Sequence, residues 1–352
     1  GQYYRTRFPH SRKHHIAVNP KPLTSGSSAK PPIPARMAQT LLEWTLHGMA
    51  RLPLGFLYPM VATPLYYLIY HIARYRRKVV RQNIAESFPS HTNDERRKIE
   101  QRFYRNFADM IVETIKLLHI SDEEMMRRMT FEGIDKIDRL FDEGKSIVAY
   151  FSHMMNWEWA PSITLWTHRH PGDGVEFCQV YRPLKNKWAD DFFLRLRSRF
   201  NSRSLPKATV FRDLLRFRRD NLLSITGFMS DQKPSHGDPT YITDFLNHPT
   251  AMITGTETLG RRLDMAIVYW DMCKPSRGHY HITIKVLSDG GKDLRSIPDM
   301  EITHAYALLL QDTIYRDPSL WLWTHRRWKI PVRFPDGHLS KTISDTSYAD
   351  HD

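Results

Sequence analysis

Short apolar runs alternate with amphipathic helical patterns along most of this sequence, and that alternation limits the fold more than any other feature. Strands are predicted for residues 146–151, 175–181, 222–227, 265–270 and 281–286. Helices are predicted for residues 93–118, 186–199, 208–218, 254–262 and 302–316, the first of them capped by Asn93 and Asp94. Strands that alternate with helices are typical of α/β folds. We therefore expect a mixed sheet flanked by helices.

The chain of 352 residues, of which 41% are hydrophobic, is long enough to bury one large core. Residues 1–36 contain seven Lys or Arg, six Pro and no acidic residue, so we expect a disordered basic extension there. Met37 resembles a natural start, which favours upstream read-through over a cleaved end, a basic arm or a transit peptide. Residues 37–75 are expected to form a helical membrane anchor, 76–332 the domain that carries the chemistry, and 333–352 a flexible tail.

The anchor prediction rests on residues 52–73, which contain no Asp, Glu, Lys or Arg and are numerous enough to cross a bilayer. Pro53, Pro59 and Pro64 interrupt this span, and its tyrosines make it more interfacial than a Leu-rich helix. We expect a kinked span or a re-entrant anchor; the alternative is a buried core helix. Basic residues after the span predict a cytoplasmic location for the downstream domain: Arg74, Arg76, Arg77, Lys78 and Arg81.

The net charge of +13 indicates a polyanionic partner, such as nucleic acid, an anionic membrane or an acidic carrier or substrate. Residues 321–328 interleave aromatic and basic side chains, a pattern that suits lipid headgroups or nucleic acid. No recognisable nucleic-acid module accompanies it, so we expect no nucleic-acid binding. Cys178 and Cys273 lack the spacing of a disulfide framework or a zinc site, and we expect neither a metal nor a cofactor.

His153 and Glu158 form an H-x4-E pattern directly after the predicted strand at residues 146–151, where α/β folds usually place their chemistry. Two residues five apart on one continuous helix are separated by about 140°, so His153 is expected just before a helix and Glu158 about one turn inside it. Glu158 would then bind one imidazole nitrogen and stabilise the imidazolium that forms when the other nitrogen takes a proton from an alcohol. The alternative is a strand-capping histidine and a solvated glutamate.

Polar side chains also follow two other predicted strands, which brings them toward the same sheet edge as His153. Arg182 closes the run at 175–181, and a guanidinium there suits phosphate; the alternative is a hydrated surface arginine. Asp231 and Gln232 follow the run at 222–229. Asp231 is expected to orient Arg182 or another cation, and Gln232 to donate a hydrogen bond to an acyl carbonyl. The alternative for Asp231 is a turn residue.

Five blocks of residues stand in the same order as in the bacterial lipid A biosynthesis acyltransferases, and the chain resembles that family over about residues 40 to 332. The blocks are 77–84 with 88–89, 153–158, 180–184, 230–232 and 323–328. Two departures occur: Met155 stands where the family commonly has glycine, and residues 245–247 replace a Phe-Phe-Gly-like segment. Both are expected near the acyl and acceptor sites, so they bear on substrate identity more than on reaction type.

The resemblance implies a glycerolipid acyltransferase-like fold in residues 76–332, on the cytoplasmic face of the bacterial inner membrane. It implies transfer of a fatty acyl chain from acyl carrier protein to a hydroxyl of a lipid A precursor, with anionic membrane lipid nearby. His153 matches the general base and Glu158 its acidic partner. The matching substrate-binding positions are Asn156, Arg182, Asp231, Gln232 and Arg326.

Two other readings remain open from the sequence. One is an acyltransferase of the same fold that acts on a lysophospholipid, an aminolipid or a pigment precursor. The other is a noncatalytic basic protein that binds membranes. If the chain is an enzyme, direct transfer is favoured over an acyl-enzyme, because a general base acting on the acceptor alcohol requires no serine or cysteine nucleophile.

Overall fold

The computed structural model describes residues 33–329 and 331–334, which divide into two compact units between Glu43 and Trp44. Residues 1–32 of the expected disordered extension lie outside the described part of the chain, and so do residues 335–352 of the expected tail. All features discussed below belong to the second unit unless stated otherwise.

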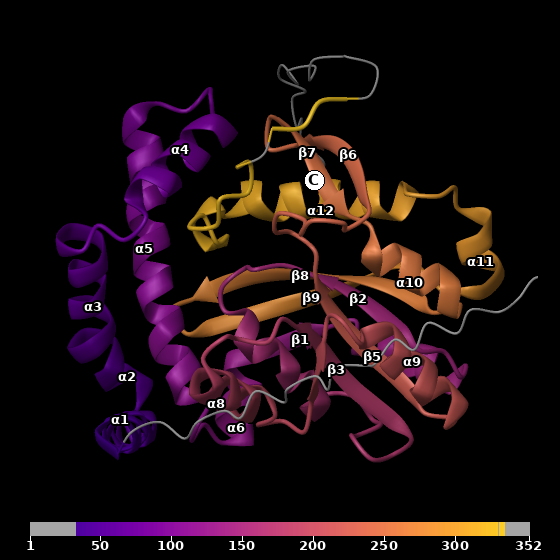
Figure 1. Cartoon of the computed structure of the whole chain (residues 1–352), viewed down its shortest axis with the longest axis horizontal. Coiled ribbons are helices and arrows are strands. Elements are labelled where there is room, and N and C mark those ends of the chain that lie inside the picture. The colour runs from indigo at the N-terminus through magenta and orange to yellow at the C-terminus, as the bar shows by residue number, and fades with distance from the viewer. Residues whose placement is uncertain (1–32, 330, 335–352) are drawn as a thin grey trace, which may run out of the picture. The chain divides into compact units, whose positions relative to one another are not determined.

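A seven-stranded sheet forms the centre of this unit, in the strand order β1-β9-β8-β2-β5-β3-β4 (Figure 1). Strands β2, β3, β4, β5 and β8 run parallel, β9 is antiparallel to β8, and β1 is parallel to β9. The sheet strands are β1 (Met129–Glu132), β2 (Ile147–Phe151), β3 (Val175–Tyr181), β4 (Arg203–Pro206), β5 (Leu223–Met229), β8 (Ala266–Ser276) and β9 (His279–Ser288). The prediction of a mixed α/β sheet is confirmed.

All five predicted strands are present, and the sequence missed two sheet strands and a separate hairpin. Strands β8 and β9 extend beyond their predicted ends because they form a hairpin. The end of β8 next to the turn is exposed, so no apolar run marks it in the sequence. The short β1 and β4 carry too few apolar residues to stand out as runs. Strands β6 (Thr240–Phe245) and β7 (His248–Ile253) pair only with each other.

Helices flank the sheet, with α10 and α12 on β2 and β8 and α9 on β4 and β5 (Figure 1). They are α4 (Arg77–Ser87), α5 (Asn93–Lys116), α6 (Asp122–Arg128), α7 (Ile134–Asp142), α8 (Lys187–Arg197), α9 (Val210–Arg219), α10 (Gly255–Leu263), α11 (Gly291–Ser296) and α12 (Glu301–Arg316), with the short 3-10 helices η3 (Trp157–Leu165) and η4 (Pro318–Leu320). The predicted caps of α5 were wrong. Thr92 caps this helix through a reciprocal pair of hydrogen bonds with Glu95.

The predicted anchor region is helical, and prolines divide it into short segments. These are α1 (Ile33–Arg51), α2 (Leu54–Leu57), the π-helical turn η1 (Tyr58–Ala62), α3 (Thr63–Tyr67) and the π-helical turn η2 (Leu68–Ile72). No single helix in the described part of the chain is long and apolar enough to cross a membrane. Met37–Arg51 and Leu54–Ile72 reach that length and composition only as a pair, bent by 113° at the break between them.

The segment from α2 to η2 packs one face on α5 and leaves the other uncovered. Its inner side chains are buried, namely Leu54, Leu57, Tyr58, Ala62, Tyr66 and Tyr70. Its outer side chains are apolar yet exposed, namely Phe56, Met60, Tyr67, Leu68 and Ile72. A contiguous exposed apolar face is unusual on a soluble surface and typical of a site that contacts membrane or protein.

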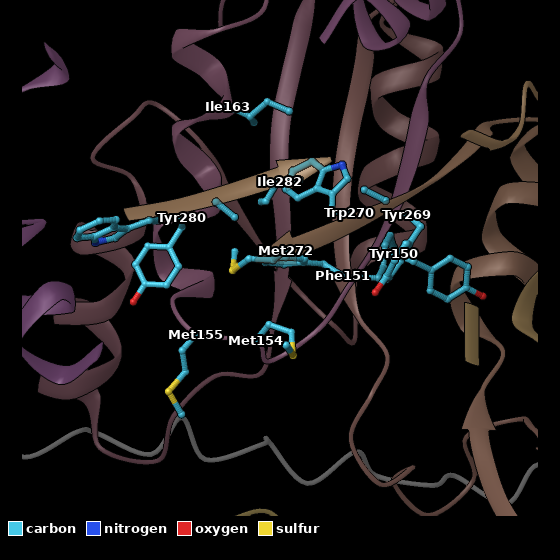
Figure 2. Close-up of a cluster of buried hydrophobic side chains, with 14 of the residues drawn as sticks. Tyr150, Phe151, Met154, Met155, Ile163, Tyr269, Trp270, Met272, Tyr280 and Ile282 are labelled. Atoms are coloured by element: carbon cyan, nitrogen blue, oxygen red, sulfur yellow. The ribbon is translucent and has the colours of Figure 1, made fainter. Parts of the chain in front are cut away.

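The core reaches the carboxyl end of β2, where it fixes the loop that follows. Met154 and Met155 are fully buried and belong to the same hydrophobic cluster as Met272 and Tyr280 (Figure 2). Because these two side chains are held in the core, the backbone on the carboxyl side of residue 153 has a fixed course.

Close packing of α10 on the sheet gives a test of this architecture. A Cβ atom at Gly260 would lie 2.8 Å from Ile267 Cδ1 and 3.2 Å from Val148 Cγ2, both buried. We expect Gly260→Ala to lower the free energy of unfolding by about 1 to 3 kcal/mol, as overpacking does, measured by urea denaturation. Gly255→Ala in the same helix is the control, since its Cβ meets nothing closer than 3.8 Å. Equal stability of the two variants would contradict the packing.

Candidate active site

Two neighbouring strands bring His153 and Asp231 together. Strands β2 and β5 are parallel and pair Phe151 with Met229, so residues two positions further along each chain lie side by side. His153 and Asp231 are those residues. The predicted convergence of polar groups at the carboxyl edge of the sheet is therefore confirmed for this pair.

Asp231 accepts three hydrogen bonds, from three different groups. The imidazole Nδ1 of His153 lies 2.8 Å from Oδ1, while the backbone N–H of His153 and the indole N–H of Trp321 each donate to Oδ2 at 2.9 Å. The Asp231 side chain is 1% exposed and that of His153 is 17% exposed. With Nδ1–H donating to the carboxylate, Nε2 is the nitrogen left to accept a proton.

The electrostatics of Asp231 favour a carboxylate in spite of its burial. Burial by itself raises the pKa of this carboxyl, but the charge of His153 and the hydrogen bonds from His153 and Trp321 outweigh that effect, so the pKa is lowered.

Glu158 does not bind His153, which corrects the expectation from the H-x4-E spacing. Its two carboxylate oxygens accept hydrogen bonds from Arg197 of α8 at 2.7 and 2.9 Å, and the indole N–H of Trp157 donates to one of them at 3.1 Å. The reason is local: the chain enters the 3-10 helix η3 at Trp157, and this geometry turns Glu158 toward α8. Glu158 reaches His153 only indirectly, because the Trp157 ring packs edge-on against the imidazole with centroids 5.0 Å apart.

Asn156, which was expected to bind substrate, is buried in this structure and has protein partners for its side chain. It is 0% exposed. Its Oδ1 accepts the backbone N–H of Glu158 and so caps η3, while its amide nitrogen donates to Glu113 Oε2 at 3.3 Å. Glu113 also accepts hydrogen bonds from the hydroxyls of Tyr58 and Tyr280. Burial raises the pKa of Glu113, with the charge of Lys274 acting in the opposite direction.

Arg182 lies at the expected sheet edge, at the end of β3, and its side chain is exposed. The expected pairing of Asp231 with Arg182 does not form, because Asp231 is occupied by His153 and Trp321. Gln232 is half-buried next to Asp231. The structure thus assembles His153 and Asp231 and leaves Arg182 at the rim.

The aromatic and basic segment 321–328 lies over the same edge. His325 Nε2 accepts the backbone N–H of Lys233 at 3.1 Å, and burial lowers the pKa of His325 to about 4, which keeps it neutral. Arg327 is 3% exposed and donates to the carbonyl of Ala251, whereas Arg326 is exposed. Arg326 is therefore the basic side chain of this pair that solvent or a ligand can reach.

Helix α4 fixes that segment in place. The amide of Asn83 donates to the carbonyls of Trp323 and His325, both at 2.9 Å, and Arg76 donates to the carbonyl of Thr324. Through Asn83, the sequence block at residues 77–84 therefore holds the backbone of segment 321–328. The sequence did not identify Trp321 as a partner of the site, because its indole N–H donates to Asp231, which lies 90 positions away in the chain.

The two departures from the family pattern are core residues. Met155 and Leu246 are each 0% exposed and belong to the hydrophobic core. They fill space inside the protein, and their expected position near the acyl and acceptor sites stays a prediction. Within residues 33–329 and 331–334, no group of His, Cys, Asp or Glu side chains is arranged to hold a metal ion.

Comparisons with known proteins agree with the blocks seen in the sequence. The family model described as bacterial lipid A biosynthesis acyltransferase matches residues 33–330. A similar curated protein from Escherichia coli (strain K12), lipid A biosynthesis palmitoleoyltransferase, is 24% identical over 270 residues, which cover 72% of this chain and 79% of that protein. The lipid A biosynthesis acyltransferase of Shigella flexneri shows the same identity and coverage. The resemblance inferred from the sequence is confirmed.

The pairing of Glu158 with Arg197 leads to a stability prediction. Their side chains are 7% and 24% exposed, so Arg197→Met would leave a buried carboxylate without its partner. We expect a loss of about 3 to 5 kcal/mol in the free energy of unfolding, and recovery of much of it in the double variant Glu158→Met/Arg197→Met. Urea denaturation measures both, with exposed Arg218→Met as the control. A near-neutral effect of Arg197→Met would contradict a stabilising role for this ion pair.

Proposed function

The chain belongs to the bacterial lipid A biosynthesis acyltransferases, and we propose that it moves a fatty acyl chain from an acyl carrier protein thioester to a hydroxyl of a lipid A precursor. Family membership makes it an acyltransferase with a lipid acceptor. The observation that supports the mechanism best is the hydrogen bond between His153 Nδ1 and the buried Asp231 carboxylate.

In the proposed reaction, His153 Nε2 takes the proton of the acceptor hydroxyl as that oxygen attacks the thioester carbonyl carbon. The new carbon–oxygen bond forms, the carbon–sulfur bond breaks, and the imidazolium returns its proton to the departing thiolate. Asp231 holds the tautomer that leaves Nε2 free and stabilises the imidazolium between the two proton transfers. A positioned general base contributes about 10² to 10⁴-fold to such a reaction.

Glu158 takes a positioning role in this proposal. It orders Arg197 and the Trp157 indole through hydrogen bonds, and the Trp157 ring packs against the imidazole of His153. The carboxylate of the H-x4-E pattern therefore acts on the histidine through an aromatic neighbour, and Asp231 provides the direct contact.

We also place the enzyme at the bacterial inner membrane with its catalytic domain on the cytoplasmic side. The exposed apolar residues on the outer face of α2–η2 support attachment to a membrane. The run of basic residues from Arg74 to Arg81 supports the orientation. The basic surplus of the chain suits both an acidic carrier protein and anionic lipid.

The mechanism predicts an order of activities among three variants. His153→Ala should lower kcat by about 10² to 10⁴-fold, since the general base is lost, and Asp231→Asn should approach that loss because the tautomer is no longer fixed. Glu158→Gln keeps its acceptor oxygen for the Trp157 indole and should retain more activity than either. The measurement is transfer from labelled acyl carrier protein thioesters into membrane lipids, with mass spectrometry of the product. Unchanged turnover in His153→Ala would refute the mechanism.

Electrostatic steering of the acidic carrier protein predicts a dependence on salt. Raising the ionic strength from low to moderate values should increase KM for the carrier-bound thioester with little change in kcat, because the interaction is screened. Initial rates at several salt concentrations measure this, and a neutral detergent-soluble acyl thioester is the control donor. A KM for the carrier-bound donor that stays constant with salt would contradict the steering.

A further inference from the structure

A cavity of about 510 Å³ lies away from His153, between the helical segment 62–67, helix α5 and the turn that joins β8 to β9. Four basic side chains line it: Arg102, Arg105, Lys274 and Arg277. They come from two elements far apart in the sequence, α5 and the β8–β9 hairpin. Two of the elements that line the cavity, α3 and α5, run next to each other in Figure 1.

The cavity has more positive charge than its acids neutralise. Asp109 binds Arg277 through two hydrogen bonds and lies 3.7 Å from Lys274, and Asp317 pairs with Arg102 at 3.3 Å. Arg105 forms no ion pair with a carboxylate in the described part of the chain; its guanidinium faces the Tyr66 ring at 5.3 Å. With four cations and two carboxylates on its wall, the cavity carries an excess of two positive charges.

The rim of this cavity continues into the exposed apolar face of the anchor segment. Tyr67 both lines the cavity and is 55% exposed, and the same outer face carries Met60 at 59% and Ile72 at 74% exposure. A basic pocket bordered by tyrosines and open apolar side chains has the layout of a lipid headgroup site at a membrane interface.

We propose that this cavity binds the phosphate group of an anionic membrane lipid, whose acyl chains lie along the apolar face of α2–η2. Guanidinium groups suit phosphate because they donate two parallel hydrogen bonds to its oxygens. A free phosphate ion would meet the same cations but would leave the apolar face uncovered, so the lipid is the occupant that satisfies both surfaces. The inference goes beyond the proposed function and does not depend on it, since neither His153 nor Asp231 lines the cavity.

The test is binding of the full chain to vesicles without an acyl donor. Vesicles of equal parts phosphatidylcholine and phosphatidylglycerol are compared with vesicles of phosphatidylcholine alone, by co-sedimentation. The variant is Arg102→Ala/Arg105→Ala, on exposed positions of α5 where alanine favours the helix. The matched control is Arg218→Ala/Arg219→Ala on exposed positions of α9, which removes the same charge from a helix that packs on β4 and β5.

We expect the α5 variant to bind the anionic vesicles about tenfold or more weakly, given the contribution of each basic residue near a membrane surface. The α9 control should change binding by less than about threefold, and His153→Ala should bind as the unaltered chain does. Should the α5 pair fail to fold, Arg105→Gln alone gives the same reading, because Arg105 has no carboxylate partner among the described residues.

Two outcomes would overturn the proposal. Equal losses in the α5 and α9 variants would mean that overall charge, and not this cavity, attracts the membrane. Binding of inorganic phosphate, measured by calorimetry, that disappears in the α5 variant while vesicle binding stays unchanged would assign the cavity to a soluble phosphate.

Discussion

The carboxylate of Asp231 is the group on which the rest of the site depends. It joins the end of β2 to the end of β5 through the imidazole and the backbone of His153, and it joins both to the C-terminal segment through Trp321. An isolated buried carboxylate is costly, and these three donors offset that cost only while all of them are in place. The two bonds from His153 that stabilise the carboxylate also orient the imidazole ring, so the same contacts determine the stability of Asp231 and the orientation of His153.

A second buried carboxylate links the helical segment α2–η2 to the loop after His153. Glu113 of α5 accepts hydrogen bonds from Tyr58 in η1, Tyr280 in β9 and Asn156 at the start of η3. The loop that carries the histidine is thus fixed at both of its sides, by Asp231 before the core methionines and by Glu113 after them. The helical segment α2–η2 and the loop that carries His153 therefore share one buried hydrogen-bond acceptor.

The sequence predicted the α/β fold and the meeting of His153 and Asp231 at one sheet edge, because both depend on local patterns. Apolar runs marked the ends of β2 and β5, and parallel pairing then placed His153 beside Asp231. The partner of His153 was assigned wrongly, since Glu158 was nearer in the sequence and the 39-residue separation between Glu158 and Arg197 gives no local signal. The cavity of α5 and the β8–β9 turn had no sequence signature either, because its basic residues come together only through tertiary packing.

The most direct test of the central claim is the protonation state of the His153 ring itself. Nuclear magnetic resonance of the chain labelled with 15N-histidine, with His153→Gln used to assign the signal, reports which ring nitrogen carries the proton. The account predicts that Nδ1 is protonated and Nε2 is free in the unaltered chain, and that this preference is lost in Asp231→Asn. A proton on Nε2, or a ring signal that is the same with and without the Asp231 carboxylate, would contradict it.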